Sequence, residues 1–145
     1  MQEFDLSPLV GSWRIVSATV TWSDTRESFE PYGPSPVGYM ILDRAGRVMF
    51  LFAKADRERP NSEGEKAASF DAMVAYTGKV RMRGPGCFVT TVDLAWNPGY
   101  CGDQLRMFEL DGDQLKVWTL ETKQPQFADR SLVAEVNWVR EPATA

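Results

Sequence analysis

Hydrophobic and polar residues alternate along most of this chain, in short stretches separated by Gly, Pro and charged residues. Alternation with a period of two is typical of β-strands that bury one face, and the interruptions mark turns. The pattern predicts eight strands, over residues 9–22, 37–43, 47–53, 76–83, 87–96, 104–110, 113–120 and 131–140. Because successive strands are joined by short connections, we expect an all-β fold, an eight-stranded up-and-down antiparallel barrel.

One segment between the third and fourth of these strands has the period of a helix instead. Residues 64–76 place four apolar side chains on one face: Ala67, Phe70, Met73 and Val74. This spacing predicts one short helix, which Asn61 or Ser62 would cap at its N-terminus. The apolar face would then lie on the barrel wall or across its mouth, where Phe70 and Met73 either line an entrance or only pack.

Turn length predicts which side chains of the later strands face the interior. A two-residue turn at positions 111–112 pairs Leu110 with Asp113. It puts four side chains on one face of the hairpin: Arg106, Phe108, Leu115 and Val117. That face is mainly apolar and the opposite face mainly polar, so we expect Arg106 and Phe108 to point inward.

The turn at residues 83–86 gives a second register, in which Tyr76 opposes Asp93 and Thr91 shares their face. If the next loop closes symmetrically, Asp93 also lies opposite Arg106. The two registers together predict an interior face with Tyr76, Asp93 and Arg106, although a β-bulge would invalidate this inference.

The second register also directs three apolar side chains outward: Phe88, Val92 and Leu94. Three explanations are open. The helix covers these side chains, or they form the interface of a homodimer, or the register is different. A homodimer is therefore a hypothesis at this point.

Composition narrows the function classes. The chain has 145 residues, a formal net charge of −4 and no His, the residue that most often serves as general base and neutral metal ligand. Its length suits one domain over residues 1–145. No run of Lys and Arg indicates a nucleic acid or an anionic membrane as partner. The first residues lack the features of a secretory signal and no apolar run reaches the about 20 residues of a membrane span, so we expect a cytoplasmic protein.

Three parts of the sequence resemble a known family. They begin with Gly11-Ser12-Trp13 and its surroundings, and in full they are residues 9–18, residues 30–42 with 46–49, and residues 97–102 with 106–115. In this order they are similar to the lipocalin-like domains of bacteria and fungi, a group of calycin-type β-barrels. The resemblance implies the barrel fold and a hydrophobic ligand, and some related barrels are cofactor-free cyclases or isomerases. Family members often have a His in the strand before the third part, where this chain has Thr90-Thr91-Val92-Asp93.

Asp93 and Arg106 are the candidates with the clearest chemistry. A guanidinium inside a ligand barrel can bind a carboxylate, enolate or carbonyl oxygen through two hydrogen bonds. Asp93 would orient Arg106 or act as a general base, or else the two form a structural ion pair between strands. The other candidates for ligand contact are aromatic and polar residues of the predicted inner face, the barrel end and the helix: Tyr39, Phe50, Phe52, Phe70, Met73, Tyr76, Thr91, Trp96, Tyr100 and Phe108.

Three functions remain open on these observations. In the first, the barrel binds a small, largely apolar organic molecule and anchors its polar group on Arg106. In the alternative, the protein is a cofactor-independent cyclase or isomerase that acts on a polyketide- or terpenoid-like natural-product substrate, with Arg106 and Asp93 as catalytic residues. In the third, side chains fill the barrel, and the protein is structural. Nucleotide-binding, hydrolase and metal-ligand motifs are absent, so we expect no cofactor and no metal.

Overall fold

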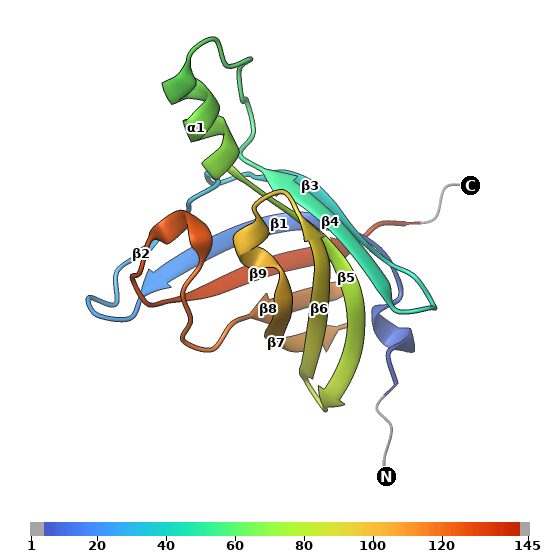
Figure 1. Cartoon of the computed structure of the whole chain (residues 1–145). Coiled ribbons are helices and arrows are strands. Elements are labelled where there is room, and N and C mark those ends of the chain that lie inside the picture. Colours follow the sequence, from blue (N-terminus) through green and yellow to red (C-terminus); the bar gives the residue numbers. More distant parts are fainter. Residues whose placement is uncertain (1–4, 143–145) are drawn as a thin grey trace.

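Residues 5–142 are described by the computed structural model, in which nine β-strands, one α-helix and three 3-10 helices follow one another (Figure 1). The strands are β1 Gly11–Trp22, β2 Ser28–Phe29, β3 Val37–Leu42, β4 Arg47–Ala53, β5 Met73–Gly84, β6 Cys87–Ala95, β7 Gly102–Asp111, β8 Gln114–Trp118 and β9 Leu132–Arg140. The α-helix is α1, Glu63–Asp71, and the 3-10 helices are η1 Ser7–Leu9, η2 Pro98–Tyr100 and η3 Pro125–Phe127.

The strands pair antiparallel in the order β2-β1-β3-β4-β5-β6-β7-β8-β9, and β1 also pairs with β9, so that the sheet closes. The long strand β1 serves three partners, because its first residues pair with β3, its last residues with β2, and most of its length with β9. Closure pairs the backbone groups that the edges of an open sheet leave free. The predicted all-β, eight-stranded antiparallel barrel is confirmed, with β2 as a short addition.

The position and length of the helix differ from the prediction. α1 follows β4, not the third strand, because the two-residue strand β2 is too short to show a period in the sequence. Ser62 caps α1 by accepting a hydrogen bond from the Glu65 N–H at 3.1 Å. Met73 and Val74, expected in the helix, instead belong to β5 and pair with β4. Pairing with a neighbouring strand therefore outweighs the helical spacing of these two residues.

The expected role of the helix is also wrong. None of the residues of α1 is buried, and Figure 1 shows the helix standing away from the barrel rather than lying on its wall or mouth. Its last turn ends where β5 begins, so it acts as part of the connection between β4 and β5. Among residues 5–142, no helix has the length and hydrophobicity that a bilayer crossing requires.

The pairing of β5 with β6 contains two irregularities, between Thr77 and Gly78 and between Met82 and Gly84. The two strands approach each other closely at Gly78, since a Cβ atom there would be 2.3 Å from the Thr91 carbonyl oxygen. Each irregularity shifts one strand by a residue and reverses which of its side chains face inward.

The irregularities overturn most of the predicted orientation of β6. Phe88 and Val92, expected on the outer face, belong to the interior, where Val92 is buried and Phe88 lines a cavity. Only Leu94 is exposed as expected. Of the three residues predicted to form a dimer interface, two therefore do not lie on the outer surface.

The hairpin of β7 and β8 turns later than expected but keeps the expected faces. Gly112, with a φ of +59°, and Asp113 form the turn, so Leu110 pairs with Leu115 rather than with Asp113. A shift of two residues preserves the alternation of inner and outer side chains. Arg106 accordingly points inward, as predicted, and lines the interior cavity.

Trp13 on β1 is fully buried and belongs to the hydrophobic core. Its indole Nε1 donates a hydrogen bond to the Leu9 carbonyl oxygen at 3.0 Å. The guanidinium of Arg140 lies 4.2 Å from the centre of the Trp13 ring and donates to the carbonyl oxygens of Pro8 and Val10 at 2.7 and 2.8 Å. These contacts tie the N-terminal segment to the first and last strands of the barrel.

Candidate functional site

The interior of the barrel contains a cavity with a volume of about 110 Å³. Most of its wall is aliphatic or aromatic: Leu9, Ala18, Val20, Met40, Leu42, Val48, Phe50, Phe52, Val74, Tyr76, Val80, Phe88, Leu115, Val117, Val136 and Trp138. A mainly apolar cavity with a few polar groups is the usual form of a site for a small organic molecule.

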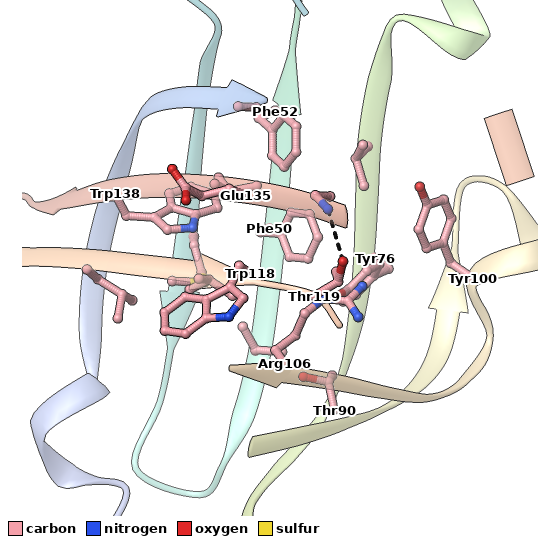
Figure 2. Close-up of a pocket in the computed structure, with 18 of the residues that line it drawn as sticks. Phe50, Phe52, Tyr76, Thr90, Tyr100, Arg106, Trp118, Thr119, Glu135 and Trp138 are labelled. Atoms are coloured by element: carbon pink, nitrogen blue, oxygen red, sulfur yellow. Dashed lines mark hydrogen bonds between the residues drawn. The ribbon is translucent and has the colours of Figure 1, made fainter. Parts of the chain in front are cut away.

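Aromatic rings from three strands form one side of the cavity (Figure 2). The Phe50 ring on β4 meets the Tyr76 ring on β5 edge to face, with 4.2 Å between centroids, and lies 5.7 Å from the Phe52 ring. Trp138 on β9 approaches Phe52 at 5.9 Å. Such pairs hold one another in place, so the cavity offers fixed ring faces to a flat apolar molecule.

Arg106 on β7 is the only cation that lines the cavity among the described residues, and Figure 2 shows its side chain extending into the barrel. Its Nη1 donates to the Leu105 carbonyl oxygen at 2.8 Å and its Nη2 to Gln104 Oε1 at 3.4 Å. No carboxylate within residues 5–142 forms an ion pair with it. Glu135, which borders the cavity, is paired instead with Lys116 at 3.6 Å. The guanidinium, with five N–H donors, therefore keeps hydrogen-bonding capacity for the cavity.

Three loops meet over the cavity through side-chain hydrogen bonds. The Tyr100 hydroxyl, from η2, donates to Gln126 Oε1, from η3, and Gln126 Nε2 donates to the Tyr32 hydroxyl at 3.1 Å. Gln124 Oε1 lies 3.3 Å from the Tyr100 hydroxyl as a second acceptor. Burial raises the pKa of the Tyr32 and Tyr100 phenols above the usual range, so both stay protonated at neutral pH. The network holds the loops together at this end of the barrel.

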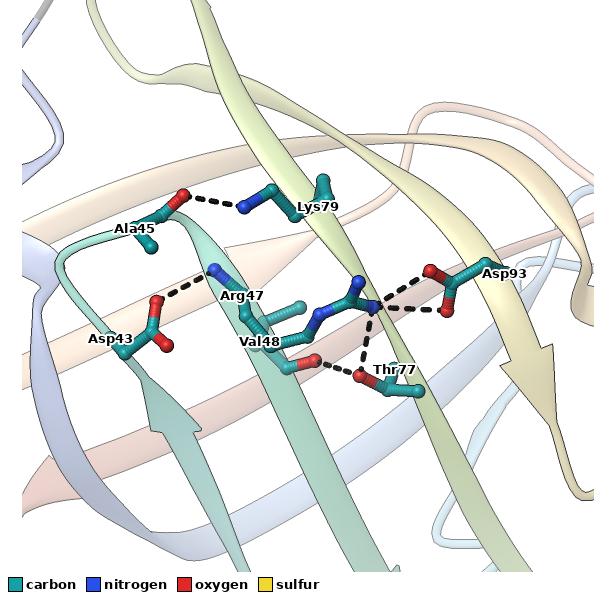
Figure 3. A network of polar contacts seen from close by, with 7 residues as sticks. All are labelled: Asp43, Ala45, Arg47, Val48, Thr77, Lys79 and Asp93. Atoms are coloured by element: carbon teal, nitrogen blue, oxygen red, sulfur yellow. Dashed lines mark hydrogen bonds and ion pairs between the residues drawn. The ribbon is translucent and has the colours of Figure 1, made fainter.

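Asp93 does not reach the cavity. Its carboxylate lies on the outer face of the barrel, where Arg47 Nη1 pairs with it at 2.8 Å and also contacts Thr77 Oγ1 (Figure 3). The predicted pair of Asp93 and Arg106 is wrong, because the bulge in β6 turns Asp93 outward and Arg106 pairs across the sheet with Phe88. The expectation that Asp93 acts as a base inside the barrel fails for the same reason.

The other predicted site residues divide between the inside and the outside. Four line the cavity together with Arg106: Phe50, Phe52, Tyr76 and Tyr100. Thr91 lies outside, donating to Asp103 Oδ1 at 2.7 Å, because the register shift between Met82 and Gly84 reverses its orientation. Tyr39 is also exposed, since Met40 and Leu42 are the residues of β3 that face the cavity.

The last four predicted residues do not line the cavity. Phe108 belongs to the interior but packs on the Phe88 ring, 5.7 Å away. Trp96 Nε1 donates to the Phe70 carbonyl oxygen at 2.9 Å, and their rings lie 5.5 Å apart, which fastens α1 to the barrel. Met73 is the first residue of β5. The prediction that Phe70 and Met73 line an entrance is therefore wrong.

Sequence reasoning also misses several residues of the cavity wall. Thr90, rather than Thr91, faces inward, because the register of β5 and β6 shifts by one residue between Met82 and Gly84. Trp138 has a signal that the sequence offers, because it alternates with Ala134 and Val136 along β9. Gln124 lies in a loop, where no periodicity identifies inward residues.

The comparison with protein families agrees with this architecture. A family model described as a lipocalin-like domain matches residues 10–141, which span all the strands from β1 to β9. Among solved structures, the crystal structure of Rv2717c from M. tuberculosis is similar to this chain, with 13% sequence identity, coverage of 94% of this chain and 95% of that chain, and a TM-score of 0.46. No curated protein matches the sequence significantly.

Proposed function

Since this chain belongs to the lipocalin-like domain family, we propose that it binds a small, largely apolar organic molecule inside its barrel and anchors a polar group of that molecule on Arg106. One observation carries the proposal: within residues 5–142, Arg106 lines a mainly apolar cavity and has no carboxylate partner. Removing a cation from water is costly unless hydrogen-bond acceptors surround it. An oxygen of the bound molecule would supply the missing acceptor.

The size of the cavity limits the ligand. An engineered apolar cavity of about 150 Å³ in another protein takes up benzene. The volume of about 110 Å³ found here is smaller, so it limits the ligand to at most about one ring or a short aliphatic chain. The rings of Phe50 and Tyr76 favour a flat molecule, and Arg106 favours one that ends in a carboxylate.

The alternative function, a cofactor-independent cyclase or isomerase, needs a residue that moves a proton. Asp93, which was expected to do so, lies on the outer face beside Arg47. The Tyr100 phenol stays protonated, because burial raises its pKa. No observation in the described residues favours catalysis, so we propose binding alone.

Isothermal titration with benzoate and benzamide tests this function, because the two molecules differ in charge but little in shape. We expect the wild-type protein to prefer benzoate, since hydrogen bonds between charged groups contribute about 1.5–3 kcal/mol. Arg106→Met should weaken benzoate binding by roughly tenfold to a hundredfold and leave benzamide binding unchanged.

Arg81→Met is the matched control, since Arg81 lies on the outer face and contacts Thr91 and Asp103. This variant should keep the preference for benzoate. Equal affinities of the wild-type protein for both molecules, or a preference that survives Arg106→Met in a folded protein, would contradict the proposal.

A further inference from the structure

The outer side of β3 and β4 is unusually apolar for a barrel whose outer side faces water. Five of its side chains are between 53% and 60% exposed, and Leu94 on β6 is 67% exposed. We call this group the outer apolar face: Val37, Tyr39, Ile41, Met49, Leu51 and Leu94. Antiparallel strands with one wet face normally carry polar residues there. On β3 and β4, both the inner and the outer positions are apolar, as they are in strands buried on two sides.

Strand register makes these side chains one continuous surface. Tyr39 pairs with Leu51 and Ile41 pairs with Met49 across β3 and β4. The row continues from Met49 to Thr77 on β5 and from Thr77 to Leu94 on β6. Residues that pair across strands place their side chains next to each other on one face, so the exposed groups form a patch rather than isolated contacts.

Charged residues of both signs border the outer apolar face. Along one edge, Arg47 pairs with Asp93 at 2.8 Å, and Lys79 donates to the Ala45 carbonyl oxygen at 2.7 Å (Figure 3). At the other edge, the exposed Arg14 of β1 pairs in register with Tyr39. An apolar centre with a polar rim is the usual anatomy of a protein interface.

We propose that the outer apolar face binds the same face of a second copy of this chain and forms a two-fold symmetric dimer. Six side chains with about half their surface exposed offer roughly 600 Å² of apolar area, the upper limit for the largest patch of a typical monomer. With the charged rim, the area approaches the about 800 Å² per partner of a standard interface. A two-fold dimer requires a surface that complements itself, and a rim with both signs of charge meets this requirement.

The mixed rim also distinguishes a second copy from other partners. An anionic membrane or a nucleic acid would require a uniformly basic border, whereas Asp93 and Arg47 neutralise each other here. The inference is independent of the proposed ligand, because the outer apolar face and the cavity lie on opposite sides of the same strands.

Sedimentation equilibrium of the full chain tests the dimer. We expect the wild-type protein to have twice the mass of one chain at concentrations on the order of 100 μM, which detects weak complexes. Leu51→Lys places a charge in the middle of the outer apolar face and should raise the dissociation constant of the dimer roughly tenfold or more. Because Leu51 is exposed, circular dichroism should show an unchanged fold.

Leu120→Lys is the matched control, since Leu120 is 57% exposed but lies after β8, away from this face. It should leave the dimer intact. A wild-type protein that stays monomeric at these concentrations overturns the proposal. So does a dimer that persists in Leu51→Lys, or one that Leu120→Lys dissociates to the same extent, because another surface would then hold the two copies together.

Discussion

Arg140 on β9 and Arg106 on β7 carry the same guanidinium but differ in the acceptors around it. Arg140 donates to the carbonyl oxygens of Pro8 and Val10 and lies over the Trp13 ring, so the protein itself satisfies it. Arg106 has one backbone acceptor, in the adjacent residue, and one long contact to Gln104. Hydrogen bonding, rather than residue type, thus separates a structural arginine from one with donors left over, as the proposed ligand contact requires.

Replacing Arg140 tests its structural role. Arg140→Ala should lower the free energy of unfolding by about 1–3 kcal/mol, because two carbonyl oxygens lose their donor and Trp13 loses its cation. Gly11→Ala should be destabilising too, since Gly11 has a φ of +136° and a Cβ atom there would lie 2.8 Å from Arg140 Nη1. Urea denaturation measures both, with the exposed Arg83→Ala as control. An Arg140→Ala loss no larger than that of Arg83→Ala would contradict this role.

Two hairpins show how far element orientation follows from sequence. In the hairpin of β7 and β8, the predicted pairing of Leu110 is wrong by two residues, but an even shift keeps Arg106 inside. In the pairing of β5 with β6, bulges at Thr77 and near Gly84 shift the register by single residues, which moves Asp93 outside. Bulges leave no mark in a hydrophobic pattern, because they depend on close approaches such as that at Gly78.

Three strands are linked on the outer face by Asp103, and this link should depend on pH. Thr91 donates to Asp103 at 2.7 Å and Arg81 contacts it at 3.2 Å, and these two hydrogen bonds lower the pKa of Asp103 below its usual value of 3.8. A carboxyl with a lowered pKa in the folded state contributes stability above its unfolded pKa and loses it as the pH falls through its folded pKa. The contribution should therefore disappear below about pH 4.

Thermal unfolding of the wild-type protein and Asp103→Asn as a function of pH measures this contribution. The wild-type protein should melt at a higher temperature at pH 7, and the two curves should converge in acid. A difference in melting temperature between the two proteins that stays constant from pH 7 down to about pH 2 would contradict the assignment.

At the scale of the whole molecule, the barrel follows from the alternation of residues and from short connections, which act locally. The cavity inside the barrel does not follow from this pattern, because the free volume depends on how rings such as those of Phe50 and Tyr76 pack against each other. The sequence also does not reveal the outer apolar face, because an apolar residue such as the exposed Tyr39 or Leu51 reads the same in a sequence as a residue of the core. Coordinates are therefore needed to locate both the cavity and the outer apolar face.

A crystal structure of the protein with bound benzoate tests the central claim most directly, because it locates the carboxylate. We expect the ring inside the barrel, in contact with the side that Phe50 and Tyr76 form together, and the carboxylate oxygens within about 3 Å of the Arg106 guanidinium nitrogens. Benzoate outside the barrel, or inside it with its carboxylate directed away from Arg106, would contradict the account.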